Sequence, residues 1–390
     1  MATLPGKRIE SIDLLKGLVM VIMALDHTRD YFHSGAFLFD PTDPSATTLP
    51  IYFTRWITHY CAPAFSFLAG LSAFFVGKRK SIGELSGFLL KRGLWLVFIE
   101  MTVVNFAWYF DVQFRTPGFL VIWSLGISML VLAALVYLPR KIILIFSCIM
   151  IFGHNLLDTV HFEGSIVWAM IHELTIFKLS ESYQLYAYYP IIPWIAVMSL
   201  GYCFGPMYDQ SFDSQKRKGI LTTIGMAASI LFVIVRGINV YGDPVKWTSY
   251  DTTVKTMMSF LNPAKYPPSL SYLLMTLGPS LLFLAYSENL KNGIAKFFST
   301  FGRVPFFYYI LHIYLIHGLA MVAAQLTGFG WHSMILNDWV TEIPSLKGFG
   351  FSLWFVYAVW AGVVVLLYPL CVKFDRYKSS HREKWWLSYL

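Results

Sequence analysis

The stretch SIDLLKGLVMVIMALDHTRDYFH, residues 11–33, starts as an apolar run and ends in a cluster of ionisable side chains. Residues 12–32 supply the roughly 20 residues that an α-helix needs to cross the hydrocarbon core of a bilayer. The last three turns nevertheless carry two His, two Asp and one Arg. A charge at the centre of a bilayer costs about 3 kcal/mol or more, so such groups face a cavity or a partner rather than lipid. The stretch therefore predicts a membrane helix that carries a polar site at one end.

Apolar runs recur along the whole 390-residue chain, which is 56% hydrophobic and only 13% charged. The charged share is about half of the ~25% typical of soluble domains. We predict an all-α polytopic membrane protein, one domain over residues 1–390, with about ten transmembrane helices. The predicted spans are 12–32, 56–77, 93–110, 119–138, 142–158, 188–206, 219–239, 270–287, 304–326 and 350–371. We expect residues 165–179 to form an interfacial or re-entrant helix on the outer side.

Basic residues set the predicted orientation of these helices. With both termini in the cytoplasm, most of the 30 Lys and Arg residues fall in inner segments, as the positive-inside rule requires. The net charge of +8 is then a topology signal, and we expect no nucleic-acid partner. The predicted outer loops are the long ones, at 33–55, 159–187, 240–269 and 327–349. Long loops in a compact protein are usually functional, which favours a substrate met on the outer side.

The ionisable residues at the end of the first helix fall on two faces. Asp26, Asp30 and His33 share one face at helical spacing, whereas His27 lies about 100° away. An Asp beside a His suits general-base chemistry, because the carboxylate fixes the imidazole tautomer and stabilises the imidazole cation. The simpler interpretation is a salt-bridged helix end, in which Arg29 neutralises an Asp.

A third His, His59, lies at a similar depth in the predicted second helix. It shares a face with Pro63, Ser66 and Gly70, and these small residues also fit simple helix packing. If the first two helices are neighbours, three His and two Asp side chains converge on one cavity near the outer side. No ligand spacing such as HExxH occurs, so we expect no metal.

Four stretches also carry a family resemblance: RIESIDLLKGLVMVIMALDHTRDYF (8–32), RWITHYCAPAFSFLAG (55–70), RGLWLVFIE (92–100) and FGRVPFFYYILHI (301–313). They resemble the bacterial branch of the heparan-α-glucosaminide N-acetyltransferase catalytic-domain family, within the wider transmembrane acyltransferases. Lys16 replaces the Arg that is commoner at the end of the first motif.

The resemblance implies an enzyme of the bacterial cytoplasmic membrane. Such an enzyme takes an acetyl group from cytosolic acetyl-CoA and delivers it to an amino or hydroxyl group of a sugar or glycan on the outer side. The resemblance also implies a homodimer and an essential His near the outer end of the first helix. Asp26 matches the Asn or Asp that precedes this His, and the candidates for the His are His27, His33 and His59. The imidazole of whichever of these His residues is catalytic is expected to act as a general base or as a transient acetyl carrier.

The donor is long and anionic, and its phosphates are predicted to lie against Arg92 and Arg303 at the inner mouth. Topology alone also explains these two arginines. The pantetheine arm would run up the bundle toward the His cluster, and we include Lys16, Tyr309 and His312 among the predicted donor-binding residues. Tyr309 and His312 lie one turn apart on one face of the ninth predicted helix.

A proton-coupled transporter or flippase is the alternative, because intramembrane Asp and His residues also form proton relays. A relay continues through the membrane. The charges here cluster toward the outer side, which favours the enzyme.

Overall fold

The computed structural model describes residues 10–381 and 383–388. The predicted cytoplasmic N-terminus and Arg8, which opens the first family motif, lie outside the described residues. The strands are β1 (Gly118–Phe119), β2 (Thr175–Lys178) and β3 (Gln184–Ala187). The helices are α1 (Glu10–Phe32), α2 (Leu49–Trp56), α3 (Cys61–Gly77), α4 (Ile82–Ile99), α5 (Asn105–Tyr109), α6 (Val121–Leu135), α7 (Arg140–Gly153), α8 (Ile166–Ile171), α9 (Ile191–Phe204), α10 (Ser214–Ile238), α11 (Thr253–Phe260), α12 (Leu270–Ser287), α13 (Gly293–Arg303), α14 (Pro305–Leu326) and α15 (Leu353–Ser380).

Within the described ranges, seven helical segments are long and apolar enough to cross a membrane. They are Leu49–Gly77, Arg140–Leu157, Ile191–Tyr208, Ser214–Ile238, Leu270–Ser287, Pro305–Leu326 and Leu353–Ser380. Each coincides with one predicted span. The other three predicted spans are also helical, but α1 carries more charge, α4 continues through a π-helical turn into α5, and α6 has only 15 residues. The helical membrane architecture is confirmed, and the count of ten stays a prediction.

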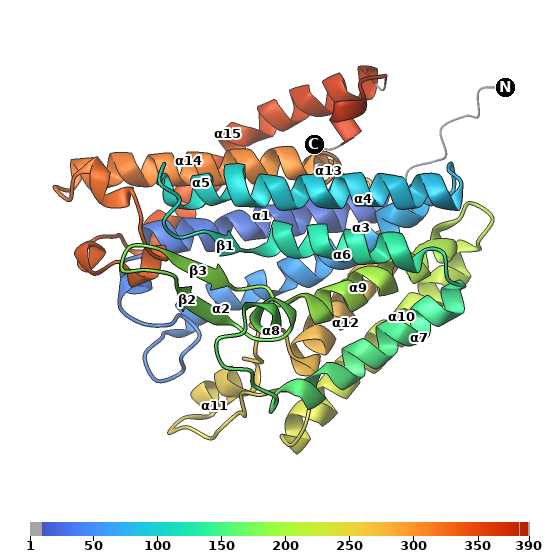
Figure 1. The fold of residues 1–390 in the computed structure, drawn as a ribbon, viewed down its shortest axis with the longest axis horizontal. Helices are drawn as coiled ribbons and strands as arrows, with labels where there is room; N and C mark the ends of the chain where they lie inside the picture. The colour runs from blue at the N-terminus through green and yellow to red at the C-terminus, as the bar shows by residue number, and fades with distance from the viewer. Residues whose placement is uncertain (1–9, 382, 389–390) are drawn as a thin grey trace.

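Helix α1 lies inside the bundle, and nearly all of its side chains are buried. It packs against α3, α13, α14 and α15. In Figure 1, α4, α6 and α14 run in roughly the same direction as α1, and the small sheet lies toward the end of the bundle where α1 finishes. Below, this end is called the outer end and the opposite end the inner end, following the predicted orientation.

Glycines allow some of these helices to approach one another closely. A Cβ atom at Gly17 would lie 1.8 Å from the carbonyl oxygen of Phe298 in α13. A Cβ atom at Gly70 in α3 would lie 1.8 Å from the Met198 carbonyl oxygen in α9, and Ser66 donates to the Trp194 carbonyl at 3.0 Å. The packing interpretation of the small-residue stripe in the second predicted helix therefore holds for Ser66 and Gly70.

The expectation of one helix over residues 165–179 is wrong in its second half. Helix α8 ends at Ile171, and β2 pairs antiparallel with β3 across a short turn. In β2 the side chains alternate between half-buried and exposed, the period of a strand with one covered face. Strand β3 also pairs in parallel with β1, so the order of the sheet is β1-β3-β2. Apolar content alone does not distinguish these two periods over so short a segment.

Candidate functional site

A cavity of about 550 Å³ opens at the outer end of α1. Three of the four long outer loops predicted from the sequence contribute to its wall, through residues such as Asp40, Lys265 and Trp339. From α1 the wall receives Asp26, His27, Arg29 and Asp30. Aromatic side chains complete it: Trp108, Tyr188, Tyr189, Tyr266, Tyr309 and Trp339. Polar groups set among aromatic surfaces are typical of a site for a small polar ligand.

His27 is held by a second imidazole. Its Nδ1 lies 2.8 Å from Nε2 of His312 in α14, and His312 Nδ1 lies 3.0 Å from the Tyr308 carbonyl oxygen. The Trp108 and His27 rings pack edge to face, with ring centroids 4.7 Å apart. His312, predicted to bind the donor, thus lies behind His27 and is fully buried. The structure brings together two histidines that are 285 residues apart in the sequence.

Asp26 does not orient His27, contrary to the expectation from the sequence. One of its carboxylate oxygens accepts from Arg29 at 2.9 Å, and the other accepts from Arg55. Arg29 also donates to Asp30 at 2.7 Å. Two carboxylates and two guanidinium groups therefore form a compact ion cluster at the end of α1. The salt-bridged helix end, the simpler interpretation of this stretch, describes Asp26 correctly.

His33 and His59 are not among the residues that line this cavity. His33 follows the last residue of α1 and forms an isolated β-bridge with Phe351. Burial and the nearby Arg29 charge both lower the pKa of His33. His59 lies in the 3₁₀ turn between α2 and α3, is buried, and its ring contacts Tyr272. The expected convergence of three His side chains on one cavity is wrong for these two, and any catalytic role for them stays a prediction.

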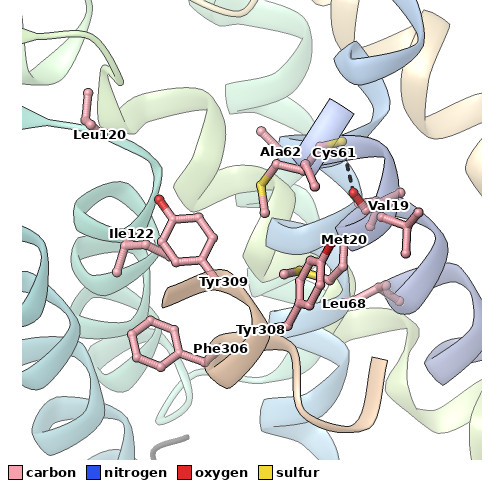
Figure 2. Packing of buried hydrophobic residues seen from close by; sticks show 14 of the residues in the cluster. Val19, Met20, Cys61, Ala62, Leu68, Leu120, Ile122, Phe306, Tyr308 and Tyr309 are labelled. Carbon is pink, nitrogen blue, oxygen red and sulfur yellow. Dashed lines mark hydrogen bonds between the residues drawn. The ribbon is translucent and has the colours of Figure 1, made fainter. Parts of the chain in front are cut away.

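A second cavity of about 190 Å³ lies on the inner side of the first. Its wall is mostly apolar, and Lys16 of α1 and Arg92 of α4 are its charged residues. Tyr309 lines both cavities, as do Met23, Phe65 and Val121. Figure 2 shows Phe306 and Tyr309 facing Ile122, whereas Tyr308 lies beside Met20.

The structure separates the predicted donor-binding residues into three places. Lys16, Arg92 and Tyr309 line the second cavity. His312 supports His27. Arg303 donates to Asp375 of α15 at 2.6 Å and does not line either cavity. Whether any of them binds a donor stays a prediction.

Sequence reasoning did not select Arg55, Lys265, Tyr266 or Trp339 as site residues. Lys265 and Tyr266 lie in NPAKYPPS, residues 262–269, within one of the long outer loops. Burial alone would raise the pKa of Tyr266, but the charges of Lys265 and Arg55 outweigh it and lower the pKa. The sequence feature that could have indicated these two residues is a Lys–Tyr pair in a Pro-rich outer loop. Such a pair is not specific for a functional site.

Over residues 10–381 and 383–388, no group of three His, Cys, Asp or Glu side chains is arranged to hold a metal ion. In a comparison with curated proteins, none matches the chain. A family description, heparan-alpha-glucosaminide N-acetyltransferase, catalytic, matches residues 8–237. This match covers more than half of the chain and includes α1 with its ion cluster, His27, and the wall of the second cavity from α1, α3, α4 and α6. The chain therefore belongs to the heparan-alpha-glucosaminide N-acetyltransferase catalytic family.

Proposed function

We propose that this protein transfers an acetyl group from cytosolic acetyl-CoA to an amino or hydroxyl group of a sugar or glycan at the outer side of a bacterial cytoplasmic membrane. Family membership indicates a membrane-bound acetyltransferase. The identity of the donor, the class of acceptor and the side of the membrane are our proposal. The observation that carries it is the pair of adjoining cavities with different chemistry. One is smaller and mostly apolar with two cationic side chains, and the other is polar and aromatic with His27 in its wall.

The inner cavity suits an acyl-CoA donor. Its apolar wall fits the pantetheine arm and the acetyl group, and Lys16 and Arg92 place positive charge where the anionic part of the donor would enter. The outer cavity suits a sugar acceptor, since its aromatic rings offer flat surfaces beside polar and charged groups. The residues shared by both walls, among them Tyr309, mark the place where the thioester would meet the acceptor.

In the proposed reaction, His27 acts as the general base. The amine or hydroxyl of the acceptor attacks the thioester carbonyl carbon and gives a proton to His27. The carbon–sulfur bond then breaks, and the CoA thiolate leaves and takes that proton as CoA–SH. General-base catalysis of this kind contributes about 10²–10⁴-fold to a rate. In the alternative route, His27 carries the acetyl group itself, which would produce a burst of CoA release without acceptor.

Calorimetric titration of the purified protein with acetyl-CoA, followed by an acetyl-transfer assay, tests this proposal. We expect micromolar binding by the wild type, weaker binding by Arg92→Ala, and unchanged binding but lost transfer in His27→Ala. Arg303→Ala is the matched control, because it also removes a cationic side chain near the inner end, one that pairs with Asp375 outside both cavities. If the wild-type protein does not bind acetyl-CoA, the proposal is wrong and a proton-coupled transporter becomes the better hypothesis.

A further inference from the structure

The hydrogen bonds around His27 define which nitrogen carries its proton. A backbone carbonyl oxygen can only accept, so the contact between the Tyr308 carbonyl and His312 Nδ1 requires a proton on that nitrogen. In a neutral imidazole the other nitrogen, His312 Nε2, is then an acceptor. The proton in the 2.8 Å contact must therefore belong to His27 Nδ1. Nε2 of His27 is left with its lone pair.

That lone pair belongs to a ring in the cavity wall. Among the residues that the structure describes, no hydrogen bond reaches His27 Nε2. A ring whose Nδ1 is occupied and whose Nε2 remains unpaired beside a ligand cavity has the arrangement that a general base requires.

Packing holds His312 in place. The ring is fully buried and lies parallel to Tyr308, with centroids 5.1 Å apart and planes 7° apart. The Tyr309 ring packs against His312 in a T-shaped arrangement, with centroids 5.6 Å apart. The ring centroids of His27 and His312 are 5.0 Å apart, which is close to the 2.8 Å N–N distance plus the radii of the two rings, and the planes differ by only 12°. The N–H···N bond therefore lies near both ring planes, as a directional hydrogen bond requires. Because His312 is fully buried, water does not reach it to replace the bond or to support a different tautomer.

We propose that His312 is a positioning residue that, anchored by the Tyr308 carbonyl, holds His27 in the Nδ1–H tautomer with Nε2 turned to the cavity. The statement about the tautomer is independent of the proposed function, and only its catalytic consequence rests on that function. When His27 takes a proton at Nε2, its Nδ1–H still donates to His312, which supports the cation without itself changing protonation. A neutral imidazole thus takes the place that the sequence had suggested for the Asp26 carboxylate.

Nitrogen NMR of the full chain in detergent, labelled with ¹⁵N in the His rings, tests the tautomer directly. We expect the His27 signals, identified by their loss in His27→Gln, to show a protonated Nδ1 and an unprotonated Nε2. His312→Gln should preserve this pattern, since the Gln carbonyl oxygen can accept from Nδ1–H. His312→Leu should lose it, because no acceptor remains. His154→Gln is the control, since His154 is another buried His whose ring nitrogens contact backbone carbonyl oxygens, at a different place in the fold. A wild-type His27 protonated at Nε2 would overturn the proposal whether or not the variants fold.

The kinetic readout tests the catalytic consequence. His312→Leu should lower kcat by about 10²-fold with little change in the KM for acetyl-CoA, and His312→Gln should recover most of the loss. An unchanged kcat in a folded His312→Leu protein would refute the positioning role. If the NMR result is as expected while even the wild type transfers no acetyl group, the proposed function fails and the assignment of the tautomer stands.

Discussion

Replacing Asp26 by Asn tests whether this residue takes part in acetyl transfer or only stabilises the ion cluster. The change keeps the shape of the side chain but removes its charge and places an N–H₂ group against one of two guanidinium groups. Arg29, whose side chain is 3% exposed, keeps its bond to Asp30. Arg55, 16% exposed, keeps the Thr58 hydroxyl at 3.1 Å and the neighbouring Tyr266 hydroxyl. One cation therefore loses its carboxylate in a largely buried place.

Removing one partner of a buried ion pair typically costs about 3–5 kcal/mol. Because Arg55 retains some exposure and the hydroxyls of Thr58 and Tyr266, we expect a loss at the lower end of this range, about 3 kcal/mol, in the free energy of unfolding. At about 2.1 cal/mol/K of unfolding entropy per residue, each kcal/mol shifts the melting temperature of a 390-residue chain by about 1.2 °C, so this loss lowers it by roughly 4 °C. The double variant Asp26→Asn/Arg55→Gln removes the uncompensated cation as well, and should be about 1–2 kcal/mol more stable than Asp26→Asn alone.

The assay is thermal unfolding in detergent, followed by acetyl transfer measured well below the melting temperature of each variant. Because His312 and not Asp26 contacts Nδ1 of His27, transfer by folded Asp26→Asn should fall less than tenfold. If Asp26→Asn melts with the wild type yet loses transfer more than a hundredfold, Asp26 takes part in the reaction and our reasoning about the cluster is wrong.

Three further changes test the packing and the loops. Gly17→Val should prevent stable folding, because even a Cβ atom there would lie 1.8 Å from a backbone oxygen of α13. Size-exclusion chromatography should show this variant as an aggregate. The control Gly83→Ala should fold normally, because a Cβ atom at Gly83 meets no atom within 4 Å. Arg236→Met should expose loop 240–269 to faster proteolysis and lower stability by about 3 kcal/mol or more, because this buried guanidinium donates to four backbone carbonyls. Burial alone would raise the pKa of Asp111, but hydrogen bonds from the neighbouring Arg side chain and backbone lower it below 3.8. A carboxyl group with a lowered pKa stabilises the folded state at pH values above the pKa it has in the unfolded chain. Asp111→Asn should therefore lower the melting temperature at pH 7, and the effect should become progressively smaller as the pH falls below about 3.8.

The sequence by itself determined the helical membrane architecture. Long apolar runs separated by basic loops require helices, since a spanning segment must satisfy its backbone hydrogen bonds internally. The cluster at the end of the first helix indicated a cavity there, because five ionisable groups cannot face lipid cheaply, and four of them line the cavity that the structure shows. Three of the four long loops line the cavity at the end of α1, although a substrate met on that side stays a prediction.

The partner of each ionisable group was decided only by the tertiary structure. Helical periodicity states which residues share a face of one helix, but it contains no information about which other helix covers that face. The bonds from His27 to His312 and from Asp26 to Arg55 depend on how α1, α14 and the turn before α3 pack together. The same packing leaves His33 and His59 out of the cavity wall. These contacts follow from close approach between separate helices, which the shapes of many side chains determine jointly and no local pattern specifies.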